Sequence, residues 1–156
     1  IDIWGVNYTI TDINELANMG RLETIVTLHD KYHLKRVNVY LNNGITQTRG
    51  FHVDSLGHRQ IKCFIYLTDV LNDNDGPYTY VPNSQQYFWR TLANIWYSTI
   101  RFKRPTDMQL FTGTHHKFHG KKGDLIITSQ DGYHRGWPQH ENAKRRLLVF
   151  VFNKGS

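Results

Sequence analysis

The sequence predicts a mainly β domain, an antiparallel sandwich or barrel to which two or three helices are attached. Short runs rich in β-branched and aromatic residues alternate with single glycines and prolines that are typical of turns. The spacing of these runs suits antiparallel pairing rather than β-α-β units. The chain has 156 residues, close to the ~150 of one average domain. Because no repeat or Pro/Gly-rich linker divides it, we expect a single domain over residues 1–156.

Five strands are predicted from these runs, at residues 36–41, 61–67, 79–81, 125–128 and 146–152. A first helix is predicted within residues 11–33, capped by Thr11 or Asp12, so that a helical part (1–34) precedes a β core (about 35–153). A second helix is predicted from Ser84, its N-cap, to about Ile100. We expect its apolar stripe to pack against the sheet; the stripe consists of Phe88, Leu92, Ile95 and Trp96.

The composition excludes several classes of protein. Hydrophobic residues make up 39% of the chain and charged residues 21%, which is too apolar for a disordered protein. The longest apolar runs, such as residues 147–152, are far shorter than the ~20 residues that span a bilayer, and no signal-peptide pattern is visible. We therefore expect a cytoplasmic protein with no membrane partner. The single cysteine, Cys63, excludes an internal disulfide, favours a reducing compartment and is expected in the core.

Charge is distributed unevenly along the chain. Residues 1–100 hold eight basic and nine acidic side chains, whereas residues 101–156 hold eleven basic and four acidic ones. The basic final third is compatible with nucleic acid, a phosphorylated substrate or a carboxylate, and equally with a solvated surface. Charge alone therefore does not select a partner.

The segment 50–54 (GFHVD) contains an imidazole and a carboxylate two residues apart. On a strand, positions i and i+2 point to the same face, so His52 and Asp54 can bind one metal ion. The composition gives about 0.6 such triplets by chance, so the triplet alone favours an ion pair on a surface strand over a metal site.

Two residues further along the chain strengthen the metal hypothesis. His134 follows an apolar strand and a turn, and it would complete a set of two histidines and one carboxylate, the facial triad of non-haem Fe(II) enzymes. Arg145 stands at the start of the last apolar strand, where its planar guanidinium suits bidentate binding of a carboxylate. The ordered set is more informative than any of its members.

These residues resemble the phytanoyl-CoA dioxygenase-like branch of the Fe(II)/2-oxoglutarate-dependent oxygenases. The resemblance covers about residues 36–152 and is carried by segments 36–54, 64–84 and 123–145. It implies a double-stranded β-helix (jelly roll, cupin-like) and a dioxygenase that uses Fe(II), 2-oxoglutarate and O2 to hydroxylate a C–H bond. The products would be succinate, CO2 and the hydroxylated small-molecule or carrier-bound metabolite. Related halogenases have a small residue in place of the carboxylate, so Asp54 favours hydroxylation.

By matching position, the resemblance implies that His52, Asp54 and His134 bind the metal and that Arg145 holds the distal carboxylate of 2-oxoglutarate. Asn38 matches a strand residue that contacts the cosubstrate, and Tyr40 lies two residues on, on the same face. Arg146 is the alternative anchor, because strand alternation lets only one of the two arginines face the pocket. The chain departs from the family at residues 82–85 (PNSQ), where the family has Pro-Gly-Ser-His; Asn83 is compatible with the positive φ of such a turn.

Several alternatives remain open from the sequence. His115, His116 and His119 lie among lysines, which fits a second metal site, a basic rim that attracts an anionic substrate, or a solvated loop. Tyr133 and Trp137 flank His134 and suit either a pocket lining or the core. The alternative functions are a nucleic-acid oxidative demethylase and a non-catalytic jelly-roll binding module.

Overall fold

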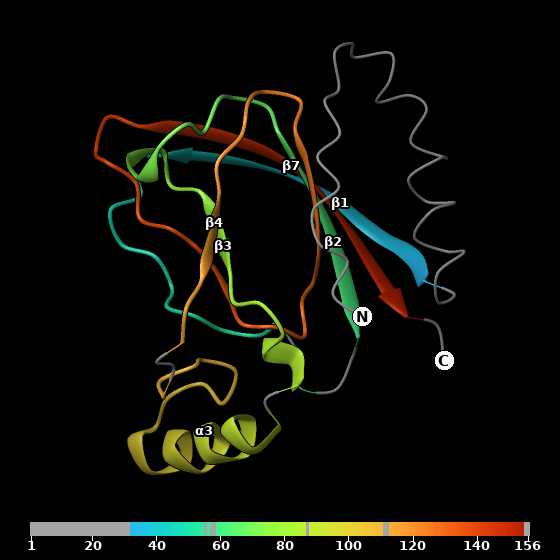
Figure 1. Ribbon diagram of the computed structural model, residues 1–156, viewed down its shortest axis with the longest axis vertical. Coiled ribbons are helices and arrows are strands. Elements are labelled where there is room, and N and C mark those ends of the chain that lie inside the picture. Colours follow the sequence, from blue (N-terminus) through green and yellow to red (C-terminus); the bar gives the residue numbers. More distant parts are fainter. Residues whose placement is uncertain (1–31, 55, 57–58, 87, 111–112, 155–156) are drawn as a thin grey trace.

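The computed structural model describes residues 32–54, 56, 59–86, 88–110 and 113–154, which form two antiparallel β-sheets and one α-helix (Figure 1). The larger sheet has the strand order β1-β7-β2-β5 and the smaller one β4-β3-β6. The strands of the larger sheet are β1 (Tyr32–Asn43), β2 (Gln60–Tyr66), β5 (Leu125–Ser129) and β7 (Lys144–Lys154). Those of the smaller sheet are β3 (Tyr78–Tyr80), β4 (His116–Phe118) and β6 (His134–Gly136).

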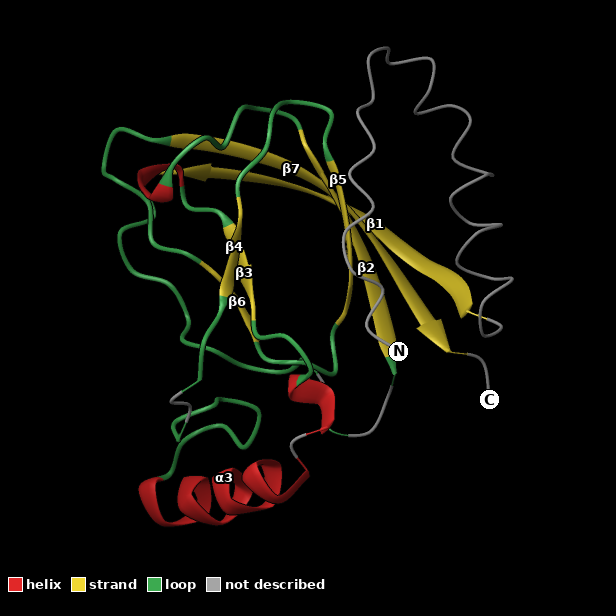
Figure 2. Ribbon diagram, viewed as in Figure 1, coloured by secondary structure: helices red, strands yellow, loops and turns green. Residues whose placement is uncertain are grey.

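The remaining elements connect these strands. They are two short 3₁₀-helices, η1 (Asp73–Asp75) and η2 (Ser84–Gln86), and the helix α3 (Phe88–Arg101). Figure 2 shows α3 at one end of the molecule, beyond the ends of the strands. None of the helices in the described part of the chain combines the length and the apolar character needed to cross a bilayer.

All five predicted strands are present, and the mainly β fold class is confirmed. One boundary is wrong, because β1 begins at Tyr32 although we expected helix up to residue 33 and a helical part up to 34. The pairing partner explains the difference: β7 continues to Lys154, and Tyr32, His33 and Leu34 pair with Lys154, Asn153 and Phe152. The rest of the first predicted helix lies outside the described residues.

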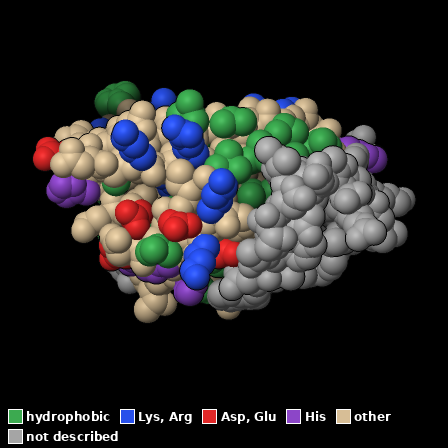
Figure 3. All heavy atoms as spheres, turned by 90° about the horizontal axis from the view of Figure 1, so that it is seen from above, with side chains coloured by type: hydrophobic (Ala, Val, Ile, Leu, Met, Phe, Trp, Pro, Cys, Tyr) green, Lys and Arg blue, Asp and Glu red, His purple; other side chains and the backbone are tan. Residues whose placement is uncertain are grey.

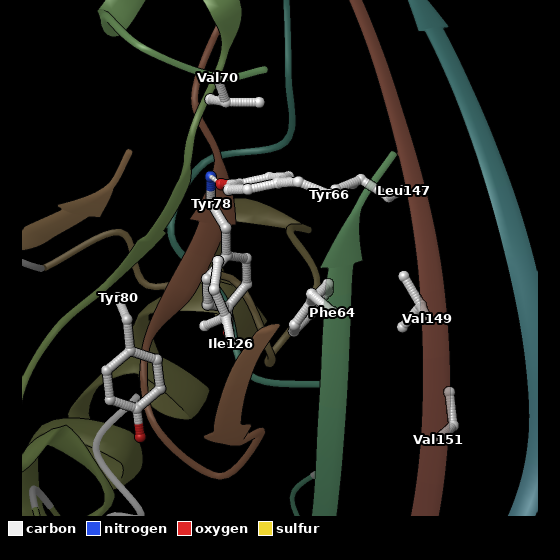
Figure 4. Packing of buried hydrophobic residues seen from close by; sticks show 9 residues of the cluster. All are labelled: Phe64, Tyr66, Val70, Tyr78, Tyr80, Ile126, Leu147, Val149 and Val151. Atoms are coloured by element: carbon white, nitrogen blue, oxygen red, sulfur yellow. Dashed lines mark hydrogen bonds between the residues drawn. The ribbon is translucent and has the colours of Figure 1, made fainter. Parts of the chain in front are cut away.

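A hydrophobic core fills the space between the two sheets. From the larger sheet, Phe64 and Tyr66 of β2 and three alternate residues of β7 point toward Tyr78 and Tyr80 of β3; the β7 residues are Leu147, Val149 and Val151 (Figure 4). Tyr66 also joins the sheets by hydrogen bonds, because its hydroxyl donates to the Phe118 carbonyl (2.7 Å) and accepts from the Tyr78 amide (3.1 Å). Side chains on this face of β7 therefore lie inside the sandwich.

The opposite face of the larger sheet carries a second apolar cluster, which includes Cys63, Ile65, Ile127 and Phe150. Cys63 has no exposed surface, so its predicted place in the core is confirmed. Burial raises the pKa of its thiol to about 12, which keeps the thiol protonated at neutral pH. Cys63 therefore has a packing role rather than a reactive one.

The orientation of α3 contradicts the prediction that its apolar stripe packs on the sheet. Phe88, Leu92 and Trp96 are exposed, whereas the buried residues of this helix are polar, Asn94 and Ser98. The cause is the segment of residues 104–109, whose backbone groups hydrogen-bond with these two side chains. Polar contacts, not apolar packing, therefore attach this helix to the rest of the protein.

Candidate metal centre

Three side chains from two distant segments of the chain, 50–54 and the start of β6, meet at one point. Ligand atoms of His52, Asp54 and His134 all lie within 4.8 Å of one another, and they form the one such group of metal-binding residues in the described part of the chain. The Oδ1 atom of Asp54 lies 3.7 Å from Nε2 of His52 and 3.5 Å from Nε2 of His134. Two imidazole nitrogens and one carboxylate oxygen thus surround one point, as a divalent transition metal requires.

Backbone pairing brings the two histidines together. His52 and His134 form an antiparallel bridge in which each amide donates to the other carbonyl at 3.0 Å. The Asp54 amide donates to the Gln130 carbonyl (3.3 Å), which links the 50–54 segment to the residues before β6. The i, i+2 spacing of His52 and Asp54 then places both side chains on the face that His134 occupies.

Each imidazole is oriented by a carbonyl two residues earlier in the chain. Nδ1 of His52 lies 2.8 Å from the Gly50 oxygen, and Nδ1 of His134 lies 2.9 Å from the Gly132 oxygen. A carbonyl oxygen only accepts hydrogen bonds, so both Nδ1 atoms carry the proton. In the neutral form of each imidazole, Nε2 therefore carries the lone pair, which is the tautomer that metal binding needs.

Burial keeps the first histidine neutral. The pKa of His52 is lowered from 6.5 to about 4, mainly because the side chain is buried and secondly because His134 lies beside it. At neutral pH this imidazole is therefore uncharged, with its one proton on Nδ1, and no proton has to leave Nε2 for it to bind a metal ion.

The carboxylate of Asp54 is held in its ionised form. Burial opposes ionisation, but hydrogen bonds and charge from His134 and Lys62 outweigh it, so the pKa of Asp54 lies well below its usual range. Lys62 contacts the second oxygen, Oδ2, through an ion pair. The two oxygens thus have different neighbours: Oδ1 faces the imidazoles and Oδ2 faces the ammonium group.

Sequence reasoning missed Lys62, although a signal was available. It lies on β2 with its side chain inside the sandwich, on the same face as Phe64 and Tyr66. A charged residue at an inward position of an otherwise apolar strand requires a partner, since an unpaired buried charge is costly. That rule predicts a carboxylate nearby, and Asp54, eight residues earlier in the chain, is the partner that the structure shows.

Arg145 lies inside the sandwich, whereas Arg146 lies outside it. Arg145 is 6% exposed and is on the face of β7 that carries Leu147 and Val149, while Arg146 is exposed on the other face. Burial lowers the pKa of Arg145. Within the described part of the chain its Nε and Nη1 atoms have no hydrogen-bond partner. A buried guanidinium with free donors is well suited to a carboxylate ligand.

Arg145 packs against β6, the strand that begins with His134. Gly136 lies two residues after His134, and a Cβ atom at this glycine would meet Nη2 of Arg145 at 3.3 Å. The guanidinium thus packs against the backbone of the strand that carries His134. The absence of a side chain at Gly136 leaves room for this approach.

The predicted cosubstrate contacts, Asn38 and Tyr40, lie on the edge strand β1. They pair with Val149 and Leu147, so they share the face of the larger sheet that carries Arg145. The side-chain amide of Asn38 donates to the Tyr40 hydroxyl at 3.4 Å, and Tyr40 is exposed. Their position is compatible with the predicted role, which stays a prediction.

The basic histidine segment lies on the outer side of the smaller sheet. Lys117 and His119 pair with Asp73 at 2.6 and 3.1 Å, and His115 stacks on Trp137. The ammonium nitrogen of Lys117 also lies over Trp137, 3.7 Å from the centroid of the indole ring. These residues cover the sheet rather than gather around a metal ion.

Tyr133, the other aromatic neighbour of His134, is buried with Val53, Val81 and Met108. The turn at residues 82–85 has the expected positive φ, since Asn83 adopts a φ of 57°. Ser84 does not cap α3 as predicted: its hydroxyl donates to the Val81 carbonyl (2.7 Å) and accepts from the Tyr133 amide (2.6 Å). This serine therefore supports the segment that leads to His134.

Comparisons with known proteins identify the fold but not a family. No family model matches the chain, and no curated protein matches its sequence. Solved structures do match: HygX from Streptomyces hygroscopicus has a TM-score of 0.66 and 17% identity over 90% of this chain and 66% of its own. EvdO2 from Micromonospora carbonacea var. aurantiaca has a TM-score of 0.69 and 14% identity over 92% of this chain and 63% of its own.

A third neighbour, SnoN, is a non-heme alpha-ketoglutarate-dependent epimerase from nogalamycin biosynthesis; it has a TM-score of 0.63 and 16% identity over 90% of this chain and 55% of its own. HygX has been solved with iron bound and with nickel and 2-oxoglutarate bound. Two of these structural neighbours, HygX and SnoN, are thus proteins that bind or depend on 2-oxoglutarate. The chain spans just under two thirds of the length of HygX, and at these identities the likeness establishes the fold alone.

Proposed function

We propose that the protein is an Fe(II)- and 2-oxoglutarate-dependent dioxygenase on a double-stranded β-helix, of the phytanoyl-CoA dioxygenase-like type, which hydroxylates a C–H bond of a small metabolite. The observation that carries the proposal is the convergence of His52, Asp54 and His134 beside a buried arginine with free donors. The iron and 2-oxoglutarate bound to HygX, a protein of the same fold, support the choice of cofactors.

The residues of the chain fit the metal. Nε2 of His52, Nε2 of His134 and Oδ1 of Asp54 would bind Fe(II), and a three-residue set leaves positions open for other ligands. The carbonyls of Gly50 and Gly132 hold the two imidazoles in the required tautomer.

The residues also fit the cosubstrate. Arg145 would hold the distal carboxylate of 2-oxoglutarate, since its guanidinium is buried and two of its nitrogens have no hydrogen-bond partner among the described residues. This ion pair would fix the orientation of the diacid, while the surrounding aromatic and aliphatic side chains of the sandwich exclude water. Iron and 2-oxoglutarate, once bound, would supply the oxidising chemistry: one oxygen atom of O2 ends in succinate, released with CO2, and the other in the hydroxylated substrate.

The proposed substrate is a small molecule, free or attached to a carrier. HygX has been solved with nickel, 2-oxoglutarate and hygromycin B bound, so a protein of this fold holds a small polar molecule beside these groups.

The direct test is an anaerobic titration with Fe(II) and 2-oxoglutarate, followed through the visible charge-transfer band of the complex and then through O2-dependent release of succinate. We expect wild-type protein to show both signals and Asp54→Ala and His134→Ala to show neither, because each variant removes a metal ligand. Thr99→Ala, an exposed change on α3, serves as the matched control.

Two results would overturn the proposal. Absence of the band in folded wild-type protein would leave a metal-independent binding module. Full succinate production by Asp54→Ala would show that the metal is bound elsewhere. Once a substrate is found, incorporation of oxygen from labelled O2 separates hydroxylation from a redox epimerisation such as that named for SnoN.

A further inference from the structure

The helix α3 exposes a continuous apolar surface. Trp89, Leu92, Trp96 and Ile100 are spaced three or four residues apart and so form one stripe along the helix. Trp89 is 79% exposed and Trp96 is 69% exposed. Exposed contiguous apolar surface of this kind is uncommon on a soluble domain and marks a site of interaction.

The residue that follows the helix extends this surface. Phe102 is 96% exposed and adopts a φ of 55°, a left-handed conformation that costs a non-glycine residue about 1 kcal/mol or more. The Lys103 amide donates to the Ser98 carbonyl (3.0 Å), which closes the helix and directs the aromatic ring outward. We define Trp89, Leu92, Trp96, Ile100 and Phe102 as the α3 apolar surface.

The polar side of the helix explains why this surface points away from the protein. Asn94 and Ser98 are about 200° around the helix from Leu92 and Trp96. The Asn94 side chain bonds to the Pro105 carbonyl (3.0 Å) and accepts from the Gln109 amide (2.8 Å), and Ser98 bonds to the Arg104 carbonyl (3.3 Å). Buried amide and hydroxyl groups with partners on this side fix the rotation of the helix about its axis.

The charged side chains of α3 and of the residues directly after it are all basic, and Asp107, in the segment on the polar side of the helix, is paired with Arg49. Residues 76–106 contain no Asp or Glu, and the basic residues in this stretch are Arg90, Arg101, Lys103 and Arg104, all exposed. At the opposite end of the molecule, basic and acidic side chains are interspersed (Figure 3). The aromatic surface and the unbalanced positive charge thus coincide on α3.

We propose that α3 lies on an anionic lipid surface, with the α3 apolar surface inserted at the interface and the four basic residues against the phospholipid headgroups. Tryptophan and phenylalanine on one face of a helix, with Lys and Arg beside them, are typical of helices that bind in the plane of a membrane. This contact requires no spanning segment, so the shortness of the apolar runs does not oppose it.

Charge also argues against a second copy of the chain as the occupant. In a two-fold symmetric contact the same surface patch meets itself, so the basic residues beside the α3 apolar surface would face their own counterparts. Such like-charge contacts oppose association, whereas an anionic bilayer complements the same residues. The absence of acidic residues in 76–106 thus favours lipid over self-association.

The test is co-sedimentation of the intact protein with vesicles of phosphatidylcholine alone or mixed with about one third phosphatidylserine. We expect binding to the anionic vesicles with at least tenfold preference, and loss of most of that preference at about 0.5 M salt. Trp89→Gln/Trp96→Gln removes two exposed rings and Lys103→Glu/Arg104→Glu reverses two charges. Each should reduce binding to anionic vesicles about tenfold or more.

Matched controls change the same chemistry elsewhere on the surface. Leu41→Gln/Leu71→Gln removes two exposed apolar side chains, and Lys121→Glu/Lys122→Glu reverses two exposed lysines outside α3. Both should bind like wild type, and circular dichroism should show all four variants folded. Equal binding to both vesicle types, equal losses in the control variants, or no binding at all would overturn the proposal. Conversion of a dimer into a monomer by Trp89→Gln/Trp96→Gln, without vesicle binding, would assign the surface to a second copy instead.

Discussion

Lys62 forms an ion pair with the oxygen of Asp54 that faces away from the two imidazoles. The carboxylate therefore offers Oδ1 to the candidate metal position, between Nε2 of His52 and Nε2 of His134, while Oδ2 is already engaged. An aspartate held in this way is restricted to binding a metal through one oxygen. Single-oxygen binding leaves more of the coordination sphere open for 2-oxoglutarate and O2.

This relationship predicts the effect of Lys62→Met. Removing the ammonium group frees Oδ2 and removes a positive charge beside the metal, so Co(II) or Ni(II) should bind at least as tightly as to wild type. The metal-loaded variant should bind 2-oxoglutarate about tenfold more weakly, because Asp54 can now occupy a second coordination position. Calorimetry measures both affinities, and the visible spectrum of the Co(II) form reports the coordination number.

Two further variants make this prediction specific. Lys62→Arg keeps a cationic donor and should retain most of the 2-oxoglutarate affinity, and Lys35→Met, an exposed change on β1, should have no effect. A weaker metal affinity with unchanged 2-oxoglutarate affinity would contradict the single-oxygen role of Asp54.

Arg145 and Arg146 provide a matched pair, because adjacent residues of β7 point to opposite faces. Arg145→Leu should weaken binding of 2-oxoglutarate at least about 30-fold, since it removes the charged partner of a carboxylate in a buried place. Without ligand the same variant should unfold at the same temperature or higher, because a buried guanidinium with unpaired nitrogens is replaced by an apolar side chain. Arg146→Leu should change neither quantity. Calorimetry and thermal unfolding measure both, and equal losses in the two variants would rule out the assignment of Arg145.

The metal-free protein should lose stability in mild acid. The pKa of His52 is lowered from 6.5 to about 4, so the unfolded state binds more protons than the folded state between these values. Stability should therefore fall as the pH decreases from 6.5 to 4, by a few kcal/mol at most, on the order of 3 kcal/mol. The depressed pKa of Asp54 adds a further loss below pH 4.

Urea unfolding in EDTA at several pH values measures the slope of the free energy of unfolding against pH. His52→Gln should flatten this slope between pH 4 and 6.5, and an unchanged slope would exclude His52 as its source.

Particular residues show how far the sequence could lead. The convergence of His52, Asp54 and His134 was predictable, because the spacing of His52 and Asp54 follows from strand geometry and His134 follows a recognisable strand and turn. Strand alternation left the choice between Arg145 and Arg146 open in the sequence, and burial now favours Arg145. The orientation of α3 was not predictable from its apolar periodicity, because Asn94 and Ser98 find backbone partners in residues 104–109 that only the fold brings within reach.

Gly50 and Gly132 have the same role and different surroundings, which leads to the last prediction. Each carbonyl accepts a hydrogen bond from Nδ1 of a triad histidine, but a Cβ atom at Gly132 would collide with the Tyr80 hydroxyl and lie 2.8 Å from Ser84 Oγ, whereas nothing lies within 4 Å of one at Gly50. Gly132→Ala should therefore lower the free energy of unfolding by about 1–3 kcal/mol and weaken metal binding, because the shift of the backbone turns the His134 ring. Gly50→Ala should stay within about 0.5 kcal/mol of wild type and bind metal normally. Urea unfolding of the metal-free proteins and titration with Co(II) measure the two effects. Equal behaviour of the two alanine variants would show that the Gly132 carbonyl does not set the geometry of the centre.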